Sequence, residues 1–232
     1  MNDLLITYRF ELGQGKTEEF RVRLDPETLD LLLPPRESYP PWTKLTFHKC
    51  PNCPLRPEEN PGCPLAMAII DIVEHFYHVL SYDRIVLEVE TAERTITQKT
   101  SAQQGLSSLL GLLIPASGCP NARYFKPMAR FHLPLANREE TVYRAVSMYL
   151  FAQYFLKRDG RETDRDLSGL KKIYDDIQIV NESIAERLRV ASEADSTVNA
   201  IVILDTFAKA VPFFIEESLD CVKPLFSSYL DH

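Results

Sequence analysis

Residues 48–64 read HKCPNCPLRPEENPGCP and hold three of the chain's five cysteines among five prolines. Proline restricts the backbone and lacks an N–H donor, so this stretch predicts an irregular loop rather than a helix or a central strand. The cysteine spacing continues downstream as Cys50-x2-Cys53-x9-Cys63-x55-Cys119. Each of these four cysteines directly precedes a proline, whereas Cys221 precedes Val222. The four therefore form a set, and Cys221 stands outside it.

The prolines favour a common thiolate site. A residue before proline is held in extended geometry, so little entropy is lost when the four sulfurs converge. Cys63 also precedes Pro64, which is typical of the first residue of a helix, and a helix N-terminus favours a thiolate. Four thiolates suit a structural zinc ion. An iron–sulfur cluster is the alternative, and a thiol redox pair at Cys50 and Cys53, or buried cysteines without metal, is the third interpretation.

The composition predicts a cytoplasmic protein. The 232 residues carry a formal net charge of −7, which argues against a nucleic-acid partner. No window approaches the 18 uninterrupted apolar residues of a membrane helix, so no membrane partner is expected. The N-terminus, MNDLLITYRFELGQG, lacks the basic region of a signal peptide. In a reducing cytosol, cysteines are more often ligands or catalysts than disulfides.

A basic segment lies in the middle of this acidic chain. Residues 94–138 contain six Lys or Arg and no Asp or Glu. One interpretation is that the segment packs against the acidic helices that follow it. The other is a small-anion site beside Cys119. Its candidate residues are Arg123, Lys126, Arg130 and His132.

Period-two alternation dominates the N-terminal half. Residues 4–12 place Ile6, Tyr8, Phe10 and Leu12 on one face, and residues 16–24 repeat the pattern after a turn, which predicts a β-hairpin. A short helical segment is expected over Glu27–Leu33, a short strand over Lys44–Phe47, and a helix from Pro64 with buried positions through Leu80. A second hairpin is predicted over residues 85–89 and 94–100.

Helical periodicity dominates the C-terminal half. A helix is expected from Ala102 until Pro115 stops it, and another over residues 139–157. Residues 170–188 carry a buried seam of Leu170, Ile173, Ile177, Val180, Ile184 and Leu188. Helices near 196–211 and 213–230 follow, and these C-terminal helices are a candidate homo-oligomer surface. The prediction is an α+β fold: an antiparallel sheet of about five strands with one or two helices, then a helical bundle. Its regions, 1–101 and 102–232, are expected to pack as one unit.

Five short motifs resemble an uncharacterised bacterial protein family. They are HKCPNCPL (48–55), CPLA (63–66), GLSSL (105–109), SGCP (117–120) and RFHLP (130–134). The likeness extends over most of the chain. It implies a bacterial cytosolic protein that folds as a single cooperative unit, and it brings no catalytic residue with it.

These patterns favour a binding or regulatory protein over an enzyme. No HExxH, GxSxG or dinucleotide-binding glycine pattern is present in the sequence. The first hypothesis is a non-catalytic protein with a structural zinc site on the four cysteines. The second is an iron–sulfur or thiol redox sensor. The third is an enzyme with an anion pocket beside Cys119.

Overall fold

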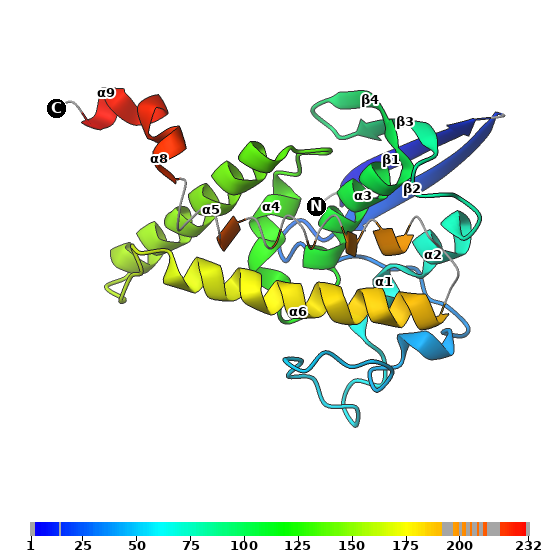
Figure 1. The fold of residues 1–232 in the computed structure, drawn as a ribbon. Helices are drawn as coiled ribbons and strands as arrows, with labels where there is room; N and C mark the ends of the chain where they lie inside the picture. The colour runs from blue at the N-terminus through cyan, green and yellow to red at the C-terminus, as the bar shows by residue number, and fades with distance from the viewer. Residues whose placement is uncertain are drawn as a thin grey trace.

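An antiparallel sheet opens the chain. The computed structural model describes residues 3–13, 15–191, 197–199, 201–202, 205, 208, 211–212 and 219–230. Four strands form the sheet in the order β2-β1-β3-β4. They are β1 (Leu4–Gly13), β2 (Lys16–Leu24), β3 (Arg84–Glu90) and β4 (Thr95–Ser101). Helices follow the sheet, so the predicted α+β class is confirmed (Figure 1).

The alternation read from the sequence decides which face of the sheet is buried. On β1, Tyr8 and Phe10 are fully buried and lie opposite Val89 and Leu87 of β3. Helix α3 (Ala102–Ala116) packs against β1, β3 and β4. The Phe76 ring meets the Phe10 ring edge to face, with centroids 5.0 Å apart. The apolar side chains of the two predicted hairpins therefore form the core beneath the helices.

The helix expected from Pro64 is interrupted. It forms α1 (Pro64–Ala68) and α2 (Ile70–Phe76), and Ile69 between them has φ −107° and ψ 7°. Cys63 is the N-cap residue of α1, as the sequence suggested. The predicted buried positions hold as far as Phe76, but Leu80 is exposed because the helix has ended by then.

Two short elements expected near the cysteine loop are absent from the described structure. Glu27–Leu33 is not helical, because the Asp25 carboxylate accepts hydrogen bonds from the N–H groups of Glu27 and Thr28 and holds a turn. Lys44–Phe47 is not a strand: Lys44 makes one isolated bridge to Gly62, and a turn follows. The described sheet therefore has four strands rather than about five. The 3-10 helix η1 (Pro41–Thr43) precedes this turn.

Two long helices dominate the C-terminal half. They are α5 (Arg138–Arg158), which begins with a capping box between Asn137 and Glu140, and α6 (Ser168–Ala191). Between α3 and α5 lie η2 (Arg123–Phe125) and α4 (Lys126–Arg130). Pro115 lies inside the last turn of α3 rather than ending it.

The helices expected near 196–211 and 213–230 fall largely outside the described residues. At the C-terminal end the structure describes α8 (Leu219–Val222), η3 (Lys223–Phe226) and α9 (Ser227–Leu230). Cys221 belongs to α8.

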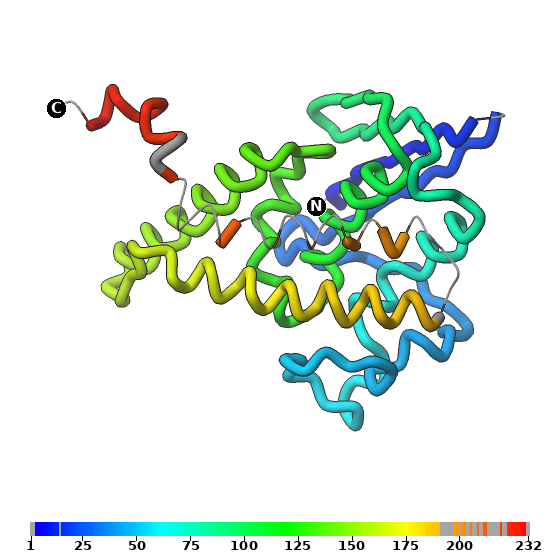
Figure 2. The backbone as a smooth tube through the Cα atoms, viewed as in Figure 1, coloured from blue at the N-terminus to red at the C-terminus, as the bar shows by residue number. Residues whose placement is uncertain are grey.

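Helix α6 lies between the sheet layer and the proline-rich loop. Figure 2 shows the loop that contains residues 40–62 on the side of α6 away from the sheet, and η1 contacts α6. Every buried position of the predicted α6 seam joins the same core cluster as the sheet residues, with Ile173 partly buried at its edge. The division at residue 101 stays a prediction, while the buried core is shared by both regions.

Gly105 allows α3 to lie close to the sheet. A Cβ atom at this position would lie 2.9 Å from Ile85 Cδ1 and 3.1 Å from Phe10 Cε1. We expect Gly105→Leu to lower the free energy of unfolding by about 2 kcal/mol or more, because the core has no room for the added atoms. Chemical denaturation measures this loss, with Gln103→Leu on the same helix as the control. Equal stability of the two variants would contradict the close packing.

Candidate functional site

The four proline-preceding cysteines come from three separate segments. Cys50 and Cys53 lie in the loop after η1, where the Cys53 N–H donates to the Cys50 carbonyl (3.0 Å). The N–H of Cys63, at the start of α1, donates to the Thr43 carbonyl (2.7 Å). Cys119 lies in the turn after α3, and its N–H donates to Ser117 Oγ (3.3 Å). Backbone hydrogen bonds thus fix each cysteine locally.

All four cysteines line one small cavity. Its volume is about 20 Å³. Its other walls are mainly apolar side chains, such as Leu45 and, from α6, Val180 and Ile184. The four thiols are free of disulfide bonds. Within the described residues, no group of three or more Cys, His, Asp or Glu side chains is drawn together into a metal-binding arrangement. The sulfurs therefore share a cavity wall rather than an assembled coordination shell.

Polar groups lie close to two of the cysteines. The backbone N–H groups of Asn121 and Ala122 favour the thiolate of Cys119, and the Ala122 N–H donates to the Cys119 carbonyl (3.1 Å). Ser183 favours the thiolate of Cys50, and its hydroxyl donates to the Ile179 carbonyl (2.8 Å). Burial raises the pKa of Cys119 to about 11 and also raises that of Cys50, and the neighbouring thiols add to both effects. In the absence of a cation these two thiols are neutral at pH 7, and binding of a metal would release their protons.

Arg187 is the charged group beside the cysteines. It is 1% exposed, and its guanidinium donates to the carbonyls of Trp42, Lys44 (2.8 Å) and His48 (3.4 Å). Burial lowers the pKa of this guanidinium, and Cys63, Cys50 and Cys53 oppose that shift. Its Nε atom has no hydrogen-bond partner among the described residues. A buried cation without a carboxylate partner needs negative charge from another source.

Two asparagines attach the cysteine loop to its neighbours. Asn52 Nδ2 donates to the backbone carbonyl of Asp176 in α6 (3.0 Å), and Asn121 Nδ2 donates to the Asn52 carbonyl (3.3 Å). Asn52 Oδ1 is buried without a partner in the described structure. The loop, the turn at Cys119 and α6 therefore meet at the cysteine cavity.

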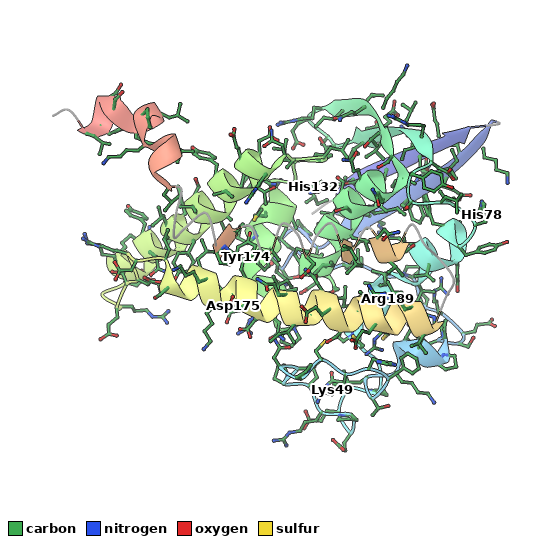
Figure 3. The ribbon with its side chains drawn as sticks, viewed as in Figure 1. Lys49, His78, His132, Tyr174, Asp175 and Arg189 are labelled. Atoms are coloured by element: carbon green, nitrogen blue, oxygen red, sulfur yellow. The ribbon has the colours of Figure 1, made fainter. Side chains whose placement is uncertain are left out.

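A second and larger cavity lies beside α6. Its volume is about 260 Å³, and residues of β4, α3, α4, α5 and α6 line it together with the loop before α5. His132 is in its wall and forms a hydrogen bond through Nε2 with the Tyr8 hydroxyl. Tyr8 also bonds Ser108 Oγ (3.1 Å). Figure 3 labels His132 near this wall and Tyr174 on α6.

Arg144 of α5 and Tyr174 of α6 also line the larger cavity. Arg144 Nη2 donates to the carbonyls of Met128 and Phe131, both at 2.9 Å. Burial lowers the pKa of Arg144, and burial raises the pKa of Tyr174. Burial, with a smaller contribution from the charge of Arg144, lowers the pKa of His132 to about 3. At pH 7 the histidine and tyrosine are neutral, so Arg144 carries the positive charge.

The residues predicted for an anion site are spread over different surroundings. Of the four, only His132 lines the larger cavity. Lys126 forms an ion pair with Asp30 (2.6 Å). Arg123 and Arg130 are exposed and lie over the rings of Tyr124 and Phe131. Their joint role in binding an anion stays a prediction.

Sequence reasoning missed Arg187 and Arg144. The signal for Arg187 was its place in the seam of α6, three residues after Ile184, where the pattern calls for an apolar side chain. Arg144 gave a weaker signal, because it lies beside Ala145 and four residues after Glu140 on a helix with many exposed positions.

Two surface properties bear on partners. Among the described helices, none is long and apolar enough to cross a membrane. Helix α5 exposes Tyr143, Phe151 and Tyr154, each more than half accessible. The structure contains a single chain and does not test self-association, so self-association through the C-terminal helices stays a prediction.

These features define an α+β protein with a small cavity lined by four cysteines and a larger cavity lined by both apolar and polar side chains. The model of one family, the Domain of unknown function (DUF6901), matches residues 6–227, and the chain belongs to this family. The likeness to an uncharacterised family is thereby shown. Searches with the chain matched no curated protein and no solved structure.

The buried state of His132 predicts a pH effect on stability. Its pKa is about 3 in the folded protein and about 6.5 when unfolded. Between these values the unfolded chain takes up a proton that the folded protein does not, so the free energy of unfolding falls as the pH drops below about 6.5. From pH 7 to 5 we expect His132 to contribute a loss of roughly 2 kcal/mol.

Urea denaturation at both pH values measures this effect. His132→Gln should show a smaller loss than the wild type, whereas replacing the exposed His75 by Gln should leave the wild-type loss in place. The same loss in His132→Gln and in the wild type would rule out a buried neutral histidine.

Proposed function

We propose that this chain is a non-catalytic binding or regulatory protein whose fold is completed by one structural Zn²⁺ on Cys50, Cys53, Cys63 and Cys119. The observation that carries the proposal is that these four cysteines, drawn from three segments, line a single cavity. Four thiolates are a complete ligand set for zinc, which leaves no position for a substrate. A bound ion would supply a crosslink rather than chemistry.

The charge balance of the site supports a metal thiolate centre. Four thiolates around Zn²⁺ carry two net negative charges. The buried guanidinium of Arg187 lies beside three of the cysteines and has no carboxylate within salt-bridge distance in the described structure. The nearby backbone N–H groups of Asn121 and Ala122, which lower the pKa of Cys119, would also stabilise a ligated thiolate. The surroundings therefore fit an anionic centre better than four neutral thiols.

The size of the cavity favours a single ion over a cluster. A volume of about 20 Å³ is near that of one water molecule or ion. An iron–sulfur cluster brings several iron and sulfide atoms and would require the walls to move apart. The redox-sensor hypothesis remains the second candidate because Cys50 and Cys53 belong to one turn. Absorption near 400 nm in anaerobically purified protein would favour the cluster.

The ligands would connect the proline-rich loop to the turn after α3. This crosslink would join Cys63 to Cys119 across the 55 residues that separate them in the chain. The free energy of metal binding would then contribute to the free energy of folding. The loop contains little regular structure of its own between η1 and α1. Its order would then depend on the metal, on Arg187 and on the two asparagines.

Metal content and melting test the proposal. Protein purified without added metal should contain about one zinc per chain by elemental analysis. Chelation should lower the melting temperature by roughly 10 °C or more, because the crosslink is lost. Cys119→Ser should purify without stoichiometric zinc, and Cys221→Ser should retain it. Zinc-free wild-type protein whose melting temperature is unaffected by a chelator would exclude the structural role.

Arg187 provides a second test, because it would balance the charge of the metal centre. We expect Arg187→Met to weaken zinc affinity at least about ten-fold, and Arg187→Lys, which keeps the charge, to weaken it less. Competition with a coloured zinc chelator measures the affinity. Arg189→Gln on the same helix, at an exposed position, is the matched control. An unchanged affinity in Arg187→Met would show that the guanidinium does not stabilise the centre.

A further inference from the structure

The larger cavity is big enough for a small organic molecule. Its volume of about 260 Å³ exceeds the roughly 150 Å³ of an engineered protein cavity that binds benzene. Scaling from benzene gives a ligand of about ten non-hydrogen atoms. The wall includes apolar side chains from α3 and α6, such as Ile114 and Ile177, and polar ones such as Ser107 and Asn181.

Arg144 gives the cavity its charge. The described residues of the wall include no Asp, Glu or Lys, and the neutral His132 and Tyr174 are the neighbours of Arg144 in it. No described carboxylate lies within salt-bridge distance of Arg144. Glu140 acts on it only through a longer-range attraction, and the Glu140 carboxylate accepts the N–H of Asn137. The wall thus contains a partly buried cation without an anion beside it.

The orientation of Arg144 is fixed before any ligand arrives. One terminal nitrogen is held by the carbonyls of Met128 and Phe131. Nη2 makes both of these bonds, and every parallel N–H pair of a guanidinium includes Nη2, so a carboxylate would not be held by two parallel hydrogen bonds. Nη1 makes none of the hydrogen bonds identified for this guanidinium and would donate one charge-assisted hydrogen bond to a carboxylate oxygen. Little side-chain entropy would be lost on binding, because the two carbonyls have already immobilised the guanidinium.

We propose that the cavity binds a small organic monocarboxylate, with its carboxylate on Arg144 and its apolar body against Ile114 and Ile177. One guanidinium balances one negative charge, which fits a monocarboxylate better than a phosphate dianion. A cationic ligand would meet Arg144 without a described carboxylate to attract it. This site is separate from the cysteine cavity, and the proposal does not depend on the metal.

Matched probes test the proposal on the wild-type protein. Phenylacetate, with ten non-hydrogen atoms, and its uncharged analogue phenylacetamide have nearly the same shape. At about one hundred times its Kd, phenylacetate should raise the melting temperature by roughly 5 °C. Phenylacetamide and inorganic phosphate at the same concentrations should not. Equal shifts with the acid and the amide, a shift with phosphate alone, or no shift with phenylacetate, hexanoate and benzoate would each overturn the proposal.

Variants locate the binding to this cavity. Arg144→Gln should weaken phenylacetate binding at least about ten-fold by calorimetry, because the positive charge and its charge-assisted hydrogen bond are lost. Ile177→Phe, which keeps Arg144 and fills part of the cavity, should also reduce binding. Arg130→Gln removes an exposed arginine of α4 that does not line the cavity, and this variant should bind as the wild type does. Full binding by folded Arg144→Gln, or its loss in Arg130→Gln, would contradict the assignment.

Discussion

A buried guanidinium requires negative charge close to it, and this requirement links the features of the protein. Arg187 is 1% exposed near the C-terminal end of α6, and its described neighbours are carbonyl oxygens and cysteine sulfurs rather than carboxylates. Carbonyls supply partial charge only. Thiolates around a metal would supply full charge at the same place, and the loop that provides two of them is the loop whose carbonyls Arg187 holds. The cysteine loop, the Arg187 guanidinium and the cysteine cavity are therefore parts of one site.

Helix α6 connects the two cavities. Val180 and Ile184 line the cysteine cavity, while Tyr174 and Ile177 line the larger one. Residues seven apart on a helix, such as Ile177 and Ile184, share a face, so the two cavities follow one another along the buried side of α6. Any change that loosens the loop from α6 would move a helix that also forms the wall of the larger cavity. The cysteine site therefore has a structural consequence beyond its own loop.

Regular periodicity made much of the fold predictable. The alternation in β1 identified the buried face, and the predicted seam of α6 is buried at every position except Ile173, which is partly buried. The errors fall where local chemistry overrides the pattern. The Asp25 side chain holds a turn in place of a helix, and the prolines around Lys44 leave one bridge in place of a strand. Leu80 was assigned to a helix that ends at Phe76, because its spacing continued a stripe beyond the helix.

The candidate site was predictable only in part. The cysteine-proline pairs singled out four residues that the structure places around one cavity, while their role as metal ligands stays a proposal. The buried Arg187 and the partly buried Arg144 were missed, because residue type alone suggests an exposed position for arginine. Arg144 shows the limit clearly, since only the folded chain reveals that α5 turns this side chain toward a cavity. Membership in the Domain of unknown function (DUF6901) family adds no residue roles.

X-ray absorption at the zinc edge addresses the central claim most directly, because it reports the atoms bonded to the metal without reference to stability. For protein as purified, the account predicts a first shell of four sulfur atoms at about 2.3 Å. A shell made mainly of nitrogen or oxygen, or fewer than three sulfurs, would contradict it.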